Sequence, residues 1–368
     1  MSNNKKKIKV AFVLGALNRG GAESLILDVC KNLMHSSFDC LCIYRKEGNM
    51  SEDFYKSGVR ILHIPKKRSM LAYMWHMRKL LQDEKVDIVH SQTPSNSLIL
   101  SFILFGTGIK LITTIHGFSF LENNRIYKHI VFKSSCKILF VSNHQMHLYQ
   151  KNYTHSIYQK CKVIYNGIDI EKFDRIYEIP DIYKEEDRIK LCVIGNIREA
   201  RRYDVIIKAA GLLRKKQICN FALYIIGDTP QNEQKRLEYY KDLCKELEIE
   251  DTVHFVGSRG DVPAILQHSD VYIMSSIETF GISIVEAMMN GVPVIINDFD
   301  VMKEVTENGK LAMLYKTGDA NDLACKIKTI IENLESNKAW SRSNVEYVTS
   351  KYSIDSCIKQ LCNIYLDV

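Results

Sequence analysis

The stretch SSIETFGISIVEAMMNGVP, residues 275–293, decides the fold of this chain. It follows a short apolar run, residues 271–274, which has the composition of a buried strand. After the loop, apolar side chains recur through residues 282–289 and predict a largely buried helix. A strand, a loop and a helix in this order present backbone N–H groups and the positive end of a helix dipole near Gly281. The sequence therefore predicts an anion site at this loop.

Two acidic residues bracket the loop. Glu278 lies on the loop itself, and Glu286 follows eight positions later, inside the predicted helix. A carboxylate does not bind phosphate, but it accepts hydrogen bonds from the hydroxyl groups of a ribose or a hexose. The arrangement suggests a nucleotide-sugar, with its phosphates at the helix start and its hydroxyls at the acids. A plain strand–helix corner, with Glu286 solvated or capping, explains the spacing alone equally well.

Together with their neighbours, these acids resemble the donor-site motif of the family 4 glycosyltransferases. The resemblance rests on Glu278 and Glu286, on Phe280-Gly281 between them, and on Glu286-Ala287-Met288 with Gly291, Pro293 and Val294 after it. It implies a retaining enzyme of the GT-B fold, in which the first Glu lies by the donor hexose and the second binds the ribose hydroxyls. It also implies that loop amides approach the hexose and the phosphates, here those of Thr279, Phe280, Gly281 and Ile282.

The first half of the chain alternates predicted strands and helices. Strands are expected at residues 8–14, 38–44, 60–64, 87–90, 110–115 and 137–141. This alternation predicts a parallel sheet covered by helices on both faces. The loop after the first strand carries Gly20 and Gly21 at a helix start, where a phosphate can approach the backbone closely. By itself the loop fits a structural turn as well, and its spacing is neither that of a P-loop nor G-x-G-x-x-G.

The resemblance extends to this first half. The string Gly20-Gly21-Ala22-Glu23 is similar to the first loop of family 4 enzymes, which lies near the donor diphosphate and the acceptor. His116 directly follows a predicted strand, at the carboxyl edge where parallel sheets bind ligands. A histidine in that position is more often structural. The family places a matching histidine beside the donor hexose, so the resemblance makes His116 a candidate site residue.

The second half repeats the pattern, with strands expected at residues 189–194, 221–226, 253–256, 271–274 and 292–296. Arg198, Arg201 and Arg202 follow the first of them. They form a solvated charge run or a phosphate site, because Arg offers planar paired donors and stays charged. Family members hold the diphosphate here. Arg198 matches the family pattern, whereas Arg201 stands in place of the family's lysine and Arg202 in place of its glycine. Which of these two contacts the diphosphate therefore stays open. Ser258 and Arg259 stand where the family cradles the base.

Metal binding has one candidate motif. Asp298-Phe299-Asp300 resembles the metal-binding D-x-D of the other nucleotide-sugar fold. Because it follows a late strand here, it is interpreted as a loop and a helix cap. We expect no metal and no cofactor apart from the donor substrate.

Length and composition predict about two domains of an ordinary globular protein, from 368 residues. The 11 cysteines are scattered without a C-x-x-C pair, as expected for reduced thiols in a cytosol. The longest apolar stretch, residues 98–105, is far shorter than the ~20 residues that span a bilayer. The apolar run after the basic start is also too short for a signal peptide. We therefore expect a cytoplasmic protein that is neither exported nor membrane-spanning.

The charge is unevenly distributed. Residues 1–180 hold 26 Lys and Arg against 14 Asp and Glu, whereas the remainder holds 24 against 29. The basic half contains KKRSMLAYMWHMRKLL, residues 66–81. Such a helix can lie on an anionic membrane or pack on a sheet with its basic side solvated. We expect its apolar side to pack and its basic side, with Lys66, Lys67 and Arg68, to contact the inner face of the cell membrane. Nucleic acid is not an expected partner.

These inferences, with the resemblance, predict an α/β protein of the GT-B fold, with two Rossmann-like domains facing each other across a cleft that holds the active site. The expected domains are residues 1–175, which bind the acceptor, and 188–350, which bind the donor. Residues 351–368 are expected to form a helix that crosses back to the first domain. The implied reaction moves a hexose from a nucleoside-diphosphate sugar to an acceptor hydroxyl, such as that of a lipid-linked glycan in surface polysaccharide synthesis, with retention and without a metal.

In this reaction Arg198 and Arg201 would stabilise the leaving diphosphate, while Glu278 and His116 would lie by the hexose. Two alternatives remain at this point. One is a nucleotide-sugar 2-epimerase of the same fold, and the other is a non-catalytic nucleotide-sugar binder.

Overall fold

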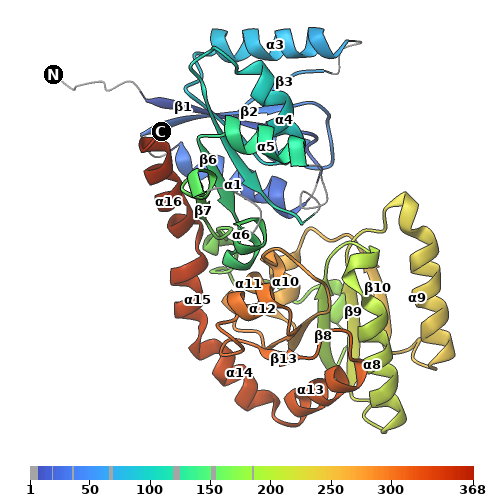
Figure 1. Ribbon diagram of the computed structural model, residues 1–368. Helices are drawn as coiled ribbons and strands as arrows, with labels where there is room; N and C mark the ends of the chain where they lie inside the picture. Colours follow the sequence, from blue (N-terminus) through green and yellow to red (C-terminus); the bar gives the residue numbers. More distant parts are fainter. Residues whose placement is uncertain are drawn as a thin grey trace. The chain divides into compact units, whose positions relative to one another are not determined.

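The chain forms two compact units in the computed structural model, which describes residues 7–18, 20–34, 37–65, 69–118, 125–150, 155–184 and 186–368. Unit 1 comprises Met1–Gly167 and Tyr352–Val368, and unit 2 comprises Ile168–Lys351 (Figure 1). Each unit contains one parallel sheet with helices packed on its faces. The predicted α/β architecture with two Rossmann-like units is therefore confirmed.

Unit 1 contains a seven-stranded sheet in the order β3-β2-β1-β4-β5-β6-β7. The strands are β1 (Ile8–Leu14), β2 (Phe38–Tyr44), β3 (Arg60–His63), β4 (Ile88–Ser91), β5 (Lys110–Ile115), β6 (Lys137–Phe140) and β7 (Cys161–Val163). The helices in its described residues are α1 (Gly21–Leu33), α2 (Ser51–Lys56), α3 (Met70–Asp83), α4 (Pro94–Ile103), α5 (Arg125–Ser134), α6 (Asn143–Gln150), α7 (His155–Tyr158) and α16 (Ile354–Leu366).

Strand β1 shows how the sequence builds the two faces of this sheet. Its side chains alternate between the faces, as they must in a strand. Val10 and Phe12 pack into one buried cluster with α1 and α16. Ala11 and Val13 pack into a second cluster with α3 and α4. A continuous apolar run is therefore needed in β1, because both of its faces are covered.

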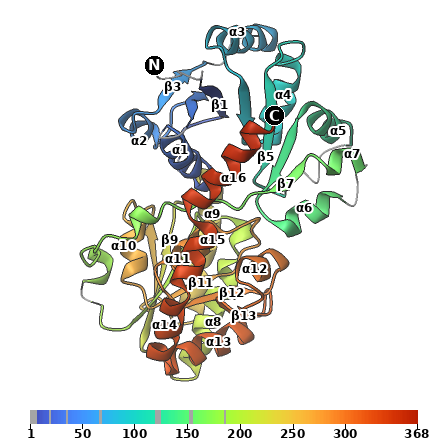
Figure 2. The same cartoon turned by 90° about the vertical axis from the view of Figure 1, so that its left-hand side faces the viewer.

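Helix α16 is the last helix of the chain and belongs to unit 1 (Figure 2). Cys357, Leu361 and Tyr365 are buried in the cluster that also holds α1. Gly167 lies directly against this helix, because a Cβ atom on it would fall 2.6 Å from Cβ of Cys357. Only glycine allows this approach without displacement.

Unit 2 contains a six-stranded sheet in the order β10-β9-β8-β11-β12-β13. The strands are β8 (Ile189–Ile194), β9 (Phe221–Ile226), β10 (Val253–Gly257), β11 (Val271–Met274), β12 (Val294–Asn297) and β13 (Met313–Tyr315). The α-helices are α8 (Tyr203–Lys215), α9 (Gln234–Glu246), α10 (Val262–Gln267), α11 (Ile282–Met289), α12 (Asp300–Val305), α13 (Ala320–Glu332), α14 (Leu334–Ser343) and α15 (Val345–Tyr352). Helices α8, α9 and α13 cover one face in a single apolar cluster.

Residues 174–188 are charged and lack sustained periodicity, a pattern that is typical of a linker. In the structure they lie in unit 2 and contain a short 3-10 helix, η3 (Asp181–Tyr183). The Tyr183 side chain is buried, and its hydroxyl lies 3.0 Å from Oγ of Ser269. Tyr183 is thus one of the contacts that dock this segment, and composition alone did not show it.

The strand order also locates the two edges where a ligand can bind. In unit 1 the order reverses between β1 and β4, and in unit 2 it reverses between β8 and β11. At such a point, consecutive connections leave the sheet on opposite faces and open a crevice at the carboxyl ends of the strands. The predicted site residues follow β1 and β5 in unit 1, and β8, β10 and β11 in unit 2.

Candidate active site

Two glycines, Gly195 after β8 and Gly227 after β9, bring the backbone close together at the carboxyl ends of these strands. A Cβ atom on Gly227 would lie only 2.1 Å from the carbonyl oxygen of Gly195, so a side chain is excluded there. Gly195 in turn lies against the Arg201 side chain, whose Cζ would be 2.8 Å from a Cβ atom on Gly195. The two glycines therefore leave room for Arg201 to fold back over the edge of the sheet.

Arg201 forms an ion pair with Glu278. Its Nη1 lies 2.6 Å from Oε1 of Glu278, and the two side chains are 25% and 27% exposed. Oγ of Ser276 donates to the same carboxylate oxygen at 3.1 Å, and Nη1 of Arg201 donates to that Oγ at 3.3 Å. Burial lowers the pKa of Arg201, but Glu278 together with Tyr203 and Tyr272 more than offsets this, so the pKa is raised overall. A firmly charged guanidinium thus lies beside a carboxylate at the edge.

Arg202 points to a different partner. Its guanidinium donates to the Asp204 carboxylate at 3.1 and 3.3 Å, and half of the side chain is exposed. Its backbone has φ 51°, in the left-handed region that favours glycine. This conformation agrees with the glycine that family members carry at the position. Of the two adjacent arginines, the structure places Arg201 beside Glu278.

The loop between β11 and α11 is held in place by Asn297, the last residue of β12. Its Nδ2 donates to the carbonyl groups of Ser275 at 3.1 Å and Ser276 at 3.0 Å. Oγ of Ser275 donates to the carbonyl oxygen of Arg201 at 2.6 Å. These bonds tie the arginine loop to the loop that carries Glu278. The sequence indicated no role for Asn297, Ser275 or Ser276, although the two serines begin the stretch of residues 275–293.

Helix α11 begins at Ile282, and Gly281 before it has φ 84°. A Cβ atom on Gly281 would also lie 2.6 Å from Cδ1 of Ile284, so a side chain there would force Ile284 to shift. Thr279 and Phe280 are buried, and Glu286 is half-buried in the helix. The first amides of any helix lack intrahelical acceptors, so the positive end of α11 lies on the same loop as Glu278.

The remaining unit 2 candidates differ in their surroundings. Arg198 is exposed, and its side chain makes no ion pair within the described part of the chain. Ser258 is exposed as well. Arg259, in contrast, is bound by Asp181 at 2.5 Å and Asp261 at 2.7 Å, which raises its pKa. Arg259 thereby fastens residues 174–188 to the sheet, a structural role that the sequence did not indicate.

The D-x-D string is engaged in local structure. Oδ1 of Asp298 accepts hydrogen bonds from the backbone N of Thr317 at 2.9 Å and from its Oγ1 at 2.7 Å. Both bonds lower the pKa of Asp298. Helix α12 begins at Asp300 after Phe299, with no side-chain cap, so the predicted capping role is wrong. The described residues contain no group of three or more His, Cys, Asp or Glu placed to hold a metal ion.

In unit 1, Gly20 is the N-cap residue of α1 and Gly21 is the first residue of the helix. The Glu23 side chain folds back over Gly20, because a Cβ atom there would lie 2.7 Å from Oε2 of Glu23. Burial raises the pKa of Glu23. The glycine at position 20 therefore leaves room for an acid at the start of α1.

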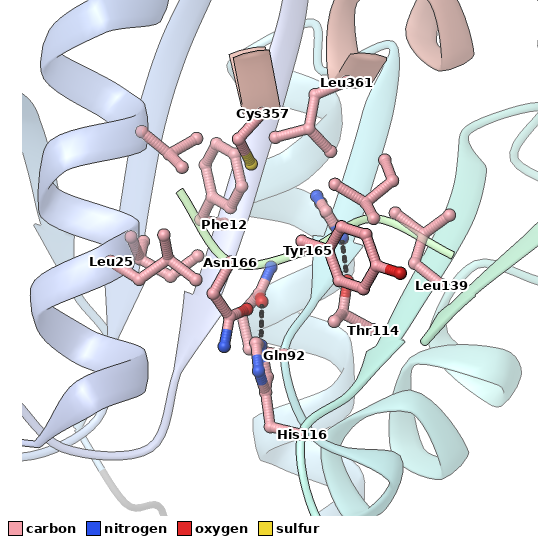
Figure 3. Close-up of a pocket in the computed structure, with 14 residues that line it drawn as sticks. Phe12, Leu25, Gln92, Thr114, His116, Leu139, Tyr165, Asn166, Cys357 and Leu361 are labelled. Carbon is pink, nitrogen blue, oxygen red and sulfur yellow. Dashed lines mark hydrogen bonds between the residues drawn. The ribbon is translucent and has the colours of Figure 1, made fainter. Parts of the chain in front are cut away.

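His116 lies at the end of β5, hydrogen-bonded through Nε2 to Oε1 of Gln92 at 2.9 Å (Figure 3). Both residues line a cavity of about 30 Å³. Burial lowers the pKa of His116 to about 4, so its imidazole is neutral near pH 7. Gln92 is buried, and its Nε2 has no hydrogen-bond partner in the described residues. The sequence did not single out Gln92, whose only signal was its place just after β4.

A second buried histidine, which also lines this cavity, connects β4 to α16. His90 lies between Oγ1 of Thr114 and the hydroxyl of Tyr365, at 2.7 Å from each. Burial, reinforced by His116, lowers the pKa of His90 to about 3. A neutral histidine can donate to one partner and accept from the other, so it bridges the sheet to α16.

Comparison with known proteins identifies the family. The family described as "Glycosyl transferases group 1" matches residues 175–346, and "Glycosyltransferase Family 4" matches residues 19–172. The chain belongs to the family 4 glycosyltransferases and has the GT-B fold, as its motifs predicted.

Among its relatives is the UDP-Gal:alpha-D-GlcNAc-diphosphoundecaprenol alpha-1,3-galactosyltransferase of Escherichia coli, 22% identical over 100% of this chain and 99% of the relative. The N-acetyl-alpha-D-glucosaminyl L-malate synthase of Bacillus anthracis is 26% identical over 81% and 79%. A solved structure of Anabaena HepE in complex with UDP and glucose has a TM-score of 0.87, at 18% identity over 98% of this chain and 100% of that one.

Proposed function

We propose that this glycosyltransferase moves a hexose from a UDP-sugar to a hydroxyl of a lipid-linked glycan in surface polysaccharide synthesis, with retention of configuration. The observation that carries the proposal is the Arg201–Glu278 pair, on the loops that lead to α8 and α11. A guanidinium suits a diphosphate, and a carboxylate accepts hydrogen bonds from sugar hydroxyls. The UDP complex of HepE supports the donor, and the diphosphoundecaprenol substrate of the E. coli relative supports the acceptor class.

In this reaction the bond between the hexose and the diphosphate breaks, and the acceptor oxygen bonds to the same carbon on the same face. The acceptor proton passes to the leaving phosphate. Arg198 and Arg201, with the first amides of α11, stabilise the charge that grows on the leaving group. Losing one such donor typically costs ~10²–10³ in rate. Because these arginines supply the positive charge, the proposed reaction needs no divalent metal.

The other candidates have binding roles in the proposal. Glu278 accepts from the hexose hydroxyls, and Glu286 accepts from the ribose. His116, neutral near pH 7, hydrogen-bonds the hexose and is not a countercharge for the diphosphate. Gly20 and Gly21 allow phosphate to approach the start of α1, and Ser258 and Arg259 border the base. Neither acid acts as a covalent nucleophile.

We further propose that the enzyme works as a peripheral protein at the inner face of the cell membrane. Unit 1 carries an exposed surface, here called the α3 face, formed by Leu71, Trp75, Arg78, Lys79 and Phe105. Its three apolar residues are 77%, 60% and 84% exposed. Apolar side chains mixed with cations fit an anionic lipid surface.

Two contacts hold the cations of the α3 face against its aromatic residues. Nη1 of Arg78 donates to the carbonyl oxygen of Phe105 at 2.8 Å, and Nζ of Lys79 lies 5.6 Å from the ring centre of Trp75. Lys66, Lys67 and Arg68, which the sequence predicted to contact the membrane, lie outside the described residues. No described helix is both long enough and apolar enough to cross a bilayer.

The experiment is a donor screen followed by a transfer assay. The purified protein is first mixed with UDP-glucose, UDP-galactose, UDP-N-acetylglucosamine and GDP-mannose, and its Tm is measured. The donor that raises Tm is then incubated with N-acetylglucosamine linked through a diphosphate to a short alkyl chain, with and without EDTA. We expect a UDP-sugar to stabilise the protein by mass action. We also expect mass spectrometry to show the acceptor heavier by one hexose, with EDTA causing no loss.

Three outcomes would contradict the proposal. Inversion at C2 of free UDP-N-acetylglucosamine without an acceptor would indicate an epimerase. Tight donor binding without turnover on any acceptor, including L-malate, would indicate a non-catalytic binder. Loss of activity with EDTA that manganese restores would give Asp298 and Asp300 a metal-binding role.

A further inference from the structure

Arg45 lies at the carboxyl edge of the unit 1 sheet. It directly follows β2, which is hydrogen-bonded to β1 on one side and β3 on the other. His63, the last residue of β3, donates from Nε2 to the carbonyl oxygen of Arg45 at 3.2 Å. The position is therefore fixed by the sheet, one strand away from the loop that carries Gly20 and Gly21.

The Arg45 guanidinium has no countercharge among the residues that the structure describes. Its Cζ lies 5.3 Å above the ring centre of Tyr73 on α3, and its Nε is buried without a hydrogen-bond partner in the described residues. The nearest acid in the sequence, Glu47, faces elsewhere. Its Oε1 accepts from the hydroxyls of Tyr44 at 2.7 Å and Tyr55 at 2.6 Å. No described carboxylate forms an ion pair with Arg45.

Most arginines at the edges of the two sheets are paired. At the amino edge of the same sheet, Nη2 of Arg60 lies 2.6 Å from Oε1 of Glu84. In unit 2, Arg201, Arg202 and Arg259 each contact a carboxylate. A partly buried charge without a partner is costly, so it is expected where an anionic ligand supplies the partner. The planar, permanently charged fork of Arg suits phosphate in particular.

We propose that Arg45 binds the diphosphate of the lipid-linked acceptor. This inference rests on the proposed function, and it assigns the acceptor phosphates to unit 1, whereas the donor diphosphate belongs to Arg198 and Arg201 of unit 2. Tyr73 stacks under Arg45, while Leu71 and Trp75 of the same helix belong to the exposed α3 face. A helix with its side chains is ~10 Å across. A diphosphate at Arg45 therefore lies one helix width from the surface where its lipid tail would enter the bilayer.

The test compares two acceptors that carry the same sugar. One is linked to a short alkyl chain through a diphosphate, and the other is the matching alkyl glycoside without phosphate. Arg45→Ala is expected to raise the KM for the diphosphate acceptor by ~10-fold to ~150-fold, the value of losing hydrogen bonds to a charged group. The KM for the neutral acceptor and for the UDP-sugar is expected to stay unchanged. Arg45→Lys keeps the charge but loses the paired donors of the guanidinium. Its KM for the diphosphate acceptor is expected to lie between those of the unchanged protein and Arg45→Ala.

Arg60→Ala is the matched control, because it removes the same charge from the opposite edge of the sheet. It is expected to leave all three KM values unchanged, and Tm measurements show whether each variant is folded. An equal loss on both acceptors, or a raised KM for the UDP-sugar, would overturn the inference. Direct binding of the diphosphate-linked acceptor, measured by calorimetry, separates this inference from the proposed function. Weaker binding to Arg45→Ala supports the site even without turnover, and equal binding overturns it.

Discussion

Arg201 and Arg202 are adjacent in the sequence, yet their guanidinium groups contact carboxylates from different elements. Arg201 contacts Glu278, which follows β11, and Arg202 contacts Asp204 on its own helix α8. The difference follows from the backbone. Arg202 has φ 51° in the left-handed region, and this turn separates the directions of the two side chains. Resemblance alone left the choice between them open, and the proposed function assigns the donor diphosphate to Arg201, the arginine that lies beside Glu278.

Substitution of the two arginines tests this assignment. Arg201→Ala is expected to lower kcat by ~10²–10³, because it removes a donor from the charge that develops on the leaving group. Arg202→Ala is expected to retain most of the activity, since it breaks a half-exposed contact with Asp204. Steady-state kinetics on both variants, with Tm as the folding control, decide the matter. A crippled Arg202→Ala beside a normal Arg201→Ala would mean that the two roles are exchanged.

Side-chain partners were the part of the site that the sequence could not supply. The motif around Glu278 indicated a sugar hydroxyl acceptor, but nothing in the sequence indicated that Arg201, 77 positions earlier, pairs with it. The resemblance implied that Arg259 borders the base, but it did not indicate the bonds of Arg259 to Asp181, which depend on how residues 174–188 dock. Such pairs are set by strand order and loop geometry, which a single sequence does not show.

At the scale of elements, the sequence was a better guide. Each unit 2 strand up to β12 was visible as an apolar run, and the three-residue strand β13 was too short to stand out. Helix α3 shows what the sequence did not predict about an element, namely which of its apolar side chains are exposed. The sequence predicted a packed apolar side and a basic outer side. In the structure Tyr73, Met77 and Leu81 are indeed buried, but Leu71 and Trp75 lie exposed beside the cations. The outer side is therefore apolar as well as basic.

Vesicle binding tests the α3 face. The protein is expected to cosediment with vesicles rich in anionic lipid at low salt and to be released at high salt, because the attraction fades within a Debye length. Leu71→Glu and Trp75→Glu are each expected to reduce binding several-fold. Tyr239→Glu, which changes an exposed aromatic residue on α9 of unit 2, is the control and is expected to bind normally. Equal binding to neutral vesicles, or full binding by both α3 variants, would contradict a membrane role for this face.

At the scale of the whole molecule, the two units differ in charge and in proposed role. Residues 1–180 carry 26 Lys and Arg against 14 Asp and Glu, and 24 of these cations and 10 of these acids fall within residues 1–167 of unit 1. The proposed acceptor ligands of this unit, a lipid diphosphate and an anionic membrane, are both negatively charged. In unit 2, Arg201, Arg202 and Arg259 each contact a carboxylate, whereas Arg198 does not within the described residues. This division matches an acceptor unit and a donor unit within one chain.

If this chain transfers a hexose with retention, as proposed, the configuration of the product must show it. The reaction is run with the UDP-sugar that binds and with the diphosphate-linked acceptor, and the new linkage is examined by proton NMR before the product can be modified further. UDP-hexoses of this kind carry an α linkage, so the account predicts an α-linked product from the first turnovers. A β-linked product would show inversion and contradict the proposed same-face reaction. A UDP-sugar epimerised at C2, with no new linkage on the acceptor, would contradict transfer altogether.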